Sequence, residues 1–265
     1  MKKLAVSICL FIAFISHSYG QNPDFALAKA MYTFKHVNDT TKRDQPKQFE
    51  TVLYLGSKGS LYRRVMDEES KPLLYVSKGG NLESFDIIEE SAAQIFLDGK
   101  SYRAERIVDN KYLITQEKPH IPWELSDEIK EIKGFEVQKA SAEYGGRFYT
   151  AWFTTEIPFS YGPWQLQGLP GLILEAYDDK KEVIFEFIQL ETKNIDNKNG
   201  KITIPKSPDF KKVTHEEFEK IYQGFLSSPM AFIRASLGLT AESQAVIQNV
   251  DNSKKEPYNP LILKK

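Results

Sequence analysis

Short segments in which β-branched or aromatic residues alternate with polar ones dominate the chain from Ala30 onward. A period of two is typical of strands that bury one face, and the intervening segments are rich in glycine, asparagine, aspartate and lysine. Connections such as Asp98-Gly99-Lys100 are short enough for hairpins, which join antiparallel strands. The predicted strands are Ala30–Asn38, Gln48–Leu55, Leu61–Asp67, Leu73–Ser77, Ser84–Glu89, Ala93–Leu97, Tyr102–Val108, Tyr112–Glu117, Phe135–Tyr144, Arg147–Thr155, Leu172–Tyr177, Val183–Leu190 and Lys201–Ile204.

Helical spacing appears only late in the chain. Thr214 and Glu217 match a capping box, and apolar residues at helical spacing follow them. A second helix is predicted to begin at Ser228-Pro229 and to end at Gly238. Leu261-Ile262-Leu263 is predicted to dock as a last edge strand. The sequence therefore predicts a mainly β (α+β) fold: a large antiparallel meander sheet or half-barrel, with one or two helices from the C-terminal region packed on one face.

Residues 1–20 have the pattern of a cleaved secretory signal peptide. Lysines at the start precede an apolar run over residues 4–15, and small residues stand at Ser18 and Gly20. The run is shorter than the roughly 20 residues that a spanning helix needs, and a retained membrane anchor is the alternative. Residues 21–265 are interpreted as a single β-rich domain without a transmembrane segment. We therefore expect an exported protein that is periplasmic, associated with the outer membrane, or secreted.

Composition argues against several classes of function. The chain has 35 lysines and arginines against 36 aspartates and glutamates, a formal charge of −1. This balance lacks the basic excess that neutralises a phosphate backbone, so we expect no nucleic-acid partner. The single cysteine, Cys9, lies in the predicted leader, which leaves the mature chain without a disulfide, a thiol nucleophile or a thiolate metal ligand. We expect no cofactor and no metal.

Catalytic motifs are missing from the sequence. It contains no Gly-x-Ser-x-Gly, no phosphate-binding glycine loop and no Gly-x-Gly-x-x-Gly. The histidines outside the leader, His36, His120 and His215, are far apart, so a Ser-His-Asp triad would have to assemble in space. His215 begins a near match to a zinc-protease helix, but Glu219 stands where the second histidine belongs. We interpret this segment as the acidic first turn of an amphipathic helix, and we predict no catalytic residue.

The segment Ile157–Glu175 is the most organised part of the sequence. In Leu169-Pro170-Gly171-Leu172, proline followed by glycine predicts a type II turn with a positive φ at Gly171. Gly162 and Gly168 would permit close approach of the backbone. The segment is either a buried corner of the sheet or the lining of a groove for a ligand or partner. The residues given a structural role are Gly162, Pro163, Gly168, Leu169, Pro170, Gly171, Leu172 and Ile173.

Aromatic residues, 12% of the chain, gather around this segment and supply most of the candidate binding residues. Arg147 is added because it precedes a strand predicted to be covered on both faces. A buried arginine would need a carboxylate partner, for which Glu175 is the candidate; the alternative is a solvent-facing arginine at a hairpin turn. Asp178-Asp179 is interpreted as a solvated turn. The candidate residues for binding a ligand or partner are Trp123, Arg147, Tyr149, Trp152, Tyr161 and Trp164.

Residues Gly168–Ile173 resemble the motif that names the GLPGLI family of exported Bacteroidetes proteins. The resemblance extends over roughly residues 22–265, and Asn259-Pro260-Leu261 is similar to the family's carboxyl end. It implies an envelope protein of unknown function, with no catalytic residues to carry over. The predicted sheet also resembles the half-barrel of periplasmic lipoprotein carriers, which hold acyl chains. The residues similar to the family's central block are Trp123, Ile132, Gly134, Lys139-Ala140, Gly146-Arg147, Tyr149, Ala151-Trp152-Phe153-Thr154, Ile157-Pro158 and Gly162-Pro163-Trp164.

Three functions are compatible with these features. The leading hypothesis is a non-enzymatic cell-envelope protein that binds an amphiphilic, lipid-like ligand or an outer-membrane partner through an aromatic-rich sheet face. One alternative is a hydrolase of envelope polymers that uses carboxylates such as Glu156 or Glu175 as acid and base. The other is a purely structural envelope subunit, which a large exposed apolar patch without a cavity would favour.

Overall fold

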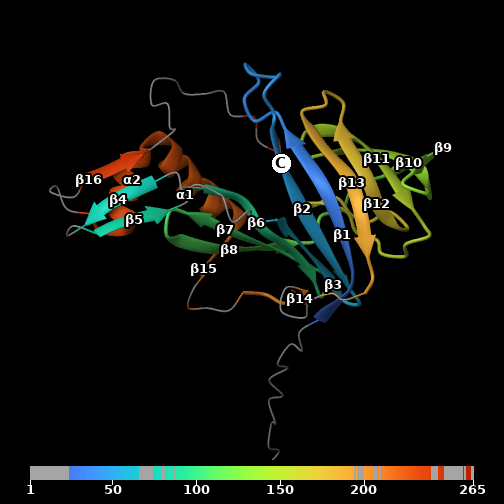
Figure 1. Cartoon of the computed structure of the whole chain (residues 1–265), viewed down its shortest axis with the longest axis horizontal. Helices are drawn as coiled ribbons and strands as arrows, with labels where there is room; N and C mark the ends of the chain where they lie inside the picture. Colours follow the sequence, from blue (N-terminus) through green and yellow to red (C-terminus); the bar gives the residue numbers. More distant parts are fainter. Residues whose placement is uncertain are drawn as a thin grey trace, which may run out of the picture.

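The computed structural model describes residues 24–65, 74–78, 81–85, 88–193, 195, 200–205, 208, 210–239, 244–247, 259 and 261–263. The predicted leader lies outside these ranges. The fold is mainly β, with a 13-stranded sheet that does not close, a three-stranded sheet and two helices near the C-terminal end (Figure 1). The predicted fold class is confirmed.

The large sheet consists of two antiparallel meanders joined through its first strand. Its order is β15-β8-β7-β6-β3-β2-β1-β13-β12-β11-β10-β9, and β14 also pairs with β1. One pairing is parallel, that of β15 with β8, so the sheet is mixed rather than purely antiparallel. The strands are β1 (Asp24–His36), β2 (Lys47–Gly56), β3 (Gly59–Arg64), β6 (Ile88–Leu97), β7 (Lys100–Ile107), β8 (Asn110–Glu117), β9 (Glu124–Ile132), β10 (Phe135–Tyr144), β11 (Arg147–Thr154), β12 (Leu172–Asp178), β13 (Val183–Glu191), β14 (Lys201–Ile202) and β15 (Lys211–Val213).

Strand predictions failed at one edge of the large sheet and in the small sheet. β9 was not predicted, because it is an edge strand whose residues are mostly exposed and charged. The predicted strand Ser84–Glu89 is wrong, since its residues divide between β5 (Asn81–Phe85) and β6. β4 (Leu74–Lys78), β5 and the unpredicted β16 (Gln244–Ile247) form the small sheet.

The two helices pack against the end of the meander that contains β7 and β8. In α1 (His215–Ser227), the Thr214 Oγ1 accepts from the Glu217 amide at 3.2 Å and the Glu217 Oε2 accepts from the Thr214 amide at 2.7 Å. This confirms the capping box. α2 (Pro229–Leu237) ends at Gly238 with φ +60°, as predicted. The helices bury Phe218, Phe225 and Ile233 against Ile107, Tyr112 and Ile114. Within the ranges given above, no helix is long and apolar enough to cross a membrane.

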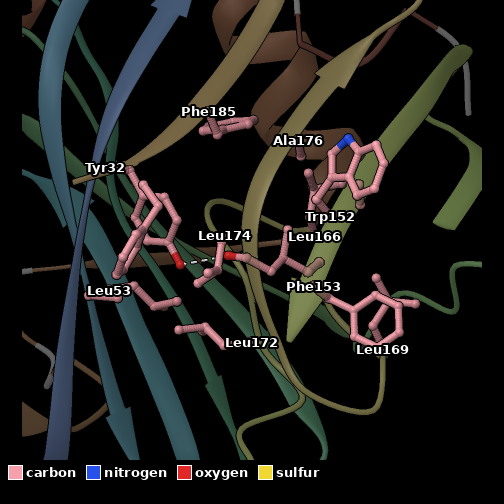
Figure 2. Packing of buried hydrophobic residues seen from close by; sticks show 14 of the residues in the cluster. Tyr32, Leu53, Trp152, Phe153, Leu166, Leu169, Leu172, Leu174, Ala176 and Phe185 are labelled. Carbon is pink, nitrogen blue, oxygen red and sulfur yellow. Dashed lines mark hydrogen bonds between the residues drawn. The ribbon is translucent and has the colours of Figure 1, made fainter. Parts of the chain in front are cut away.

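The main core lies between the inner face of the sheet and the loop that connects β11 to β12. Leu166 and Leu169 of this loop are in one buried cluster with Tyr32 and Leu53 (Figure 2). The fully buried Tyr32 donates its hydroxyl hydrogen to the Ile173 carbonyl at 2.8 Å. This hydrogen bond ties β1 to β12 across the core and satisfies a phenol that would otherwise be desolvated without a partner.

Candidate functional site

The loop of residues 155–171, here called the motif loop, folds back onto the inner face of the sheet as a small hairpin. Tyr161 and Gln167 form an isolated bridge, and the Leu166 amide donates to the Pro163 carbonyl at 3.2 Å. Trp164, inside this turn, has φ +57°, a left-handed conformation that costs a residue other than glycine about 1–2 kcal/mol. The backbone holds this conformation with the Trp164 side chain buried.

The structural roles of the three glycines in the motif differ in part from those predicted. Gly171 does not have a positive φ, so the type II turn is wrong; instead, a Cβ there would lie 2.0 Å from the Thr154 carbonyl oxygen. Gly168 has φ +96°, and an added Cβ would meet no atom within 4 Å, so its role is conformational rather than close approach. Gly162 does permit close approach, because its Cβ would lie 2.8 Å from Ile173.

An aromatic pocket lies between the motif loop and strands β1, β2, β3 and β13. Its volume is about 310 Å³, counted with its open mouth. Stacked and edge-to-face contacts organise the rings: Phe34 lies 4.8 Å from Phe185 and 5.0 Å from Phe49, measured between ring centroids. Such contacts fix ring orientation as well as burying apolar area. The lining residues are Phe34, Phe49, Thr51, Tyr62, Arg64, Trp164, Phe185 and Leu261.

Arg147 is the centre of a buried polar network. Its Nη1 lies 2.6 Å from Asp178 Oδ2 and 3.0 Å from Glu182 Oε2, and its Nη2 donates to Asn259 Oδ1 at 2.6 Å. All four side chains are buried. Arg43 also donates to Glu182. The guanidinium therefore neutralises two carboxylates that burial would otherwise make very unfavourable.

This network holds Asn259 and residues 261–263, here called the C-terminal strap, against the end of the sheet. Asn259 donates its amide hydrogens to the Val37 carbonyl at 2.7 Å and to Glu182 Oε2 at 2.9 Å. Arg147 Nε donates to the Leu261 carbonyl at 3.2 Å, and the Leu263 amide donates to the Gly145 carbonyl at 2.6 Å. The strap is not the edge strand that its apolar residues suggested, and its Leu261 side chain lines the aromatic pocket.

Acid is expected to weaken this network through Glu182. Burial alone would raise its pKa, but hydrogen bonds from Arg147, Asn259 and Arg43 outweigh burial and lower the pKa below the usual 4.5. A carboxylate with a lowered folded-state pKa contributes stability above its unfolded-state pKa and loses it as pH falls through the folded-state value.

Urea unfolding of the wild type and of Glu182→Gln, followed from about pH 7 to about pH 3, measures this contribution. The wild type should be the more stable at neutral pH, and the difference should shrink below about pH 4.5 as Glu182 takes up its proton. A difference that stays constant over the whole range would contradict the assignment.

The structure separates the predicted binding residues into different environments. Trp164 lines the aromatic pocket; Tyr161 stacks on Phe96 with centroids 6.2 Å apart; Trp123 donates its indole hydrogen to the Gln167 carbonyl at 2.9 Å. Arg147 and Tyr149 are buried beside the strap network, and burial raises the pKa of the Tyr149 phenol. They therefore do not form one continuous surface.

Two predicted polar assignments are wrong. Glu175 does not pair with Arg147; its Oε1 lies 2.8 Å from Lys130 Nζ, and that ammonium also lies 4.2 Å from the centre of the Trp152 ring. Of the predicted solvated pair, Asp179 is exposed, as predicted, but Asp178 is fully buried. The Asp178 Oδ1 accepts hydrogen bonds from the backbone amides of Glu182 and Val183, and its Oδ2 accepts one from Arg147. The alternative of a solvent-facing Arg147 is wrong for the same reason.

The sequence did not identify several site residues as members of one site. Asp178 and Glu182 flank a charged turn that looks solvated, and Asn259 lies far along the chain from Arg147. Phe34, Phe49 and Phe185 were predicted only as strand residues. Their convergence depends on the pairing of β1 with β13, which joins distant segments. In the part of the chain that the structure describes, no three His, Cys, Asp or Glu residues form a group that could hold a metal ion.

Comparison with solved structures finds similarity to PNGF-II in two crystal forms. Sequence identities are 11% and 10%, and TM-scores are 0.47 and 0.49. The matches cover 73% and 76% of this chain but 32% and 33% of the other, so this chain spans about a third of the length of PNGF-II. A comparison with curated proteins finds no match. Over residues 146–175, which contain all of β11, the motif loop and the start of β12, the chain is similar to a family described as a protein of unknown function (Porph_ging).

Proposed function

We propose that this chain is a non-enzymatic binding protein of the cell envelope that takes up an amphiphilic ligand, and that residues 21–265 form its single mature domain after removal of a leader at residues 1–20. The observation that carries the proposal is the aromatic pocket between the motif loop and the sheet. The leader pattern and the resemblance to the GLPGLI family support the compartment. The matched family is itself of unknown function.

The geometry of the pocket suits an apolar group better than a polar substrate. Concave sites lined mainly by hydrophobic and aromatic side chains, with few polar groups, are typical of small-molecule binding. Four phenylalanine and tyrosine rings and one indole face the same space. The strained backbone of Trp164 favours a functional role, since strain of this kind is retained where a side chain must be aimed.

No observation in the described residues favours the two alternatives. Glu156 is exposed and accepts a hydrogen bond from the Glu136 amide, and Glu175 is paired with Lys130. Neither carboxylate lines the aromatic pocket. Pockets for polymer hydrolysis require an acid and a base on either side of the scissile bond, which these two residues do not supply here.

Copurification tests the proposed function. The full chain, leader included, is produced in a Gram-negative host, recovered from the periplasmic fraction, and extracted with organic solvent for mass spectrometry. We expect a bound amphiphile in near-stoichiometric amount. Trp164→Ala should retain much less of it, whereas Trp123→Ala, which lies outside the pocket, should retain it. Extracts without an amphiphile, together with a chain confined to the cytoplasm, would contradict the proposal.

A further inference from the structure

The aromatic pocket contains one cationic side chain, Arg64 at the end of β3. Its guanidinium carbon lies 4.5 Å from the centre of the Phe49 ring, so the charged group rests on a wall of the pocket. Its backbone is paired with Thr51, another lining residue. Arg64 is thus fixed at the pocket by both its strand and its ring contact.

One hydrogen-bond donor of Arg64, its Nε, has no acceptor in the described part of the chain. This nitrogen is buried, although the residue as a whole is only half-buried. A buried guanidinium nitrogen without an acceptor is unfavourable, so such groups normally have a partner. Arginine also presents its donors in a planar fork that matches a carboxylate or phosphate. An anionic group of a ligand would supply the missing acceptor.

We infer that the ligand is an anionic amphiphile, whose headgroup pairs with Arg64 and whose apolar chain enters between the aromatic rings under Leu261. This inference rests on the proposed function and names the chemistry of the same pocket. A neutral apolar molecule would leave the buried Arg64 Nε without an acceptor, and a cationic amphiphile would be repelled by the guanidinium. The headgroup is a carboxylate or a phosphate ester, both of which satisfy the fork.

Leu261 covers the pocket with its side chain, and this side chain can be changed without removing the backbone hydrogen bond that attaches the strap to Arg147. Its side chain lines the pocket, whereas its backbone carbonyl accepts the hydrogen bond from Arg147. A substitution at Leu261 therefore changes the space for the chain but leaves the Arg147 contact in place. Leu263, on the same strap, is 42% exposed and provides a matched position outside the pocket.

The charge of the ligand is tested by equilibrium dialysis with palmitate, its methyl ester and lysophosphatidate, each below its micellar concentration. Arg64→Gln should weaken palmitate binding by roughly tenfold to a hundredfold, the loss of a charge-assisted hydrogen bond, and leave the methyl ester unchanged. Arg63→Gln is the control, because successive side chains of a strand point to opposite faces and Arg63 therefore lies on the other face of β3 from Arg64. Its guanidinium carbon lies 5.3 Å from the centre of the Tyr54 ring. Whichever of palmitate and lysophosphatidate binds the wild type with the higher affinity identifies the headgroup as a carboxylate or a phosphate ester.

The position of the chain is tested with two bulky substitutions. Leu261→Trp should fill the pocket and reduce binding of palmitate and its ester at least tenfold, whereas Leu263→Trp should bind both like the wild type. Unchanged methyl ester binding by Arg64→Gln shows that this variant is folded. Palmitate that binds Arg64→Gln and Arg63→Gln equally, or binds the wild type no better than its ester, overturns the inference but not the proposed function. Failure of every probe and of copurification overturns both.

Discussion

Replacing Arg147 with methionine is expected to lower the free energy of unfolding by about 3–5 kcal/mol. The substitution leaves Asp178, which is fully buried, and Glu182 without the guanidinium that neutralises them. It also removes the hydrogen bonds to Asn259 and to the Leu261 carbonyl, so the strap loses part of its attachment. Urea unfolding of purified wild type and variant at neutral pH measures the loss.

A surface ion pair provides the matched control for Arg147. Lys35 Nζ lies 2.8 Å from Glu186 Oε2 with both side chains partly exposed, so Lys35→Met should change stability by no more than about 1 kcal/mol. Adding Asp178→Asn and Glu182→Gln to Arg147→Met should recover part of the loss, since the uncompensated charges are then gone. A loss at Arg147 no larger than that at Lys35 would contradict the buried network.

Gly171→Ala is expected to destabilise the protein by about 3 kcal/mol, at the upper end of the effects of overpacking. The added methyl group would lie 2.0 Å from the Thr154 carbonyl oxygen and 3.0 Å from the Thr155 Cα, which are backbone atoms. Backbone cannot rotate away as a side chain can, so the end of β11 and the start of β12 must separate. The midpoint and slope of urea unfolding report this change.

Gly168, in the same motif, provides a matched comparison for Gly171→Ala. Gly168→Ala introduces the same methyl group where no atom lies within 4 Å, at φ +96°, and should cost only about 1–2 kcal/mol of conformational strain. The two variants therefore separate steric contact from backbone strain within one loop. A larger loss at Gly168 than at Gly171 would contradict the close contact of Gly171 with the Thr154 backbone.

The strands could be predicted because burial on one face produces a pattern of local sequence. Phe135–Tyr144 was predicted with the bounds that β10 has, since apolar residues are interspersed with polar ones along it and glycines precede and follow it. β9 carries four acidic residues and lies at the sheet edge, where one side has no neighbour and no such pattern is required. Local composition therefore identifies interior strands better than edges.

The candidate site could be predicted only in part, because its residues meet through distant pairing. Trp164 was selected from the motif, and it does line the pocket. Arg147 was selected as a residue that would need a carboxylate if buried, but the predicted partner was Glu175, whereas the partners are Asp178 and Glu182. In the paired β11 and β12, Glu175 lies opposite Trp152 and therefore interacts with Lys130 instead. The register that decides this is not contained in either strand alone.

Local sequence was sufficient to predict the class of fold and the capped ends of the helices, since each of these follows from neighbours within a turn or a strand. The tertiary structure decided which charges are buried together, which glycine meets backbone and which rings enclose the pocket. These depend on contacts such as Arg147 with Asn259, 112 positions apart, and Tyr32 with Ile173, 141 positions apart. Long-range contacts are set by sheet pairing and packing, which local residue preferences do not specify.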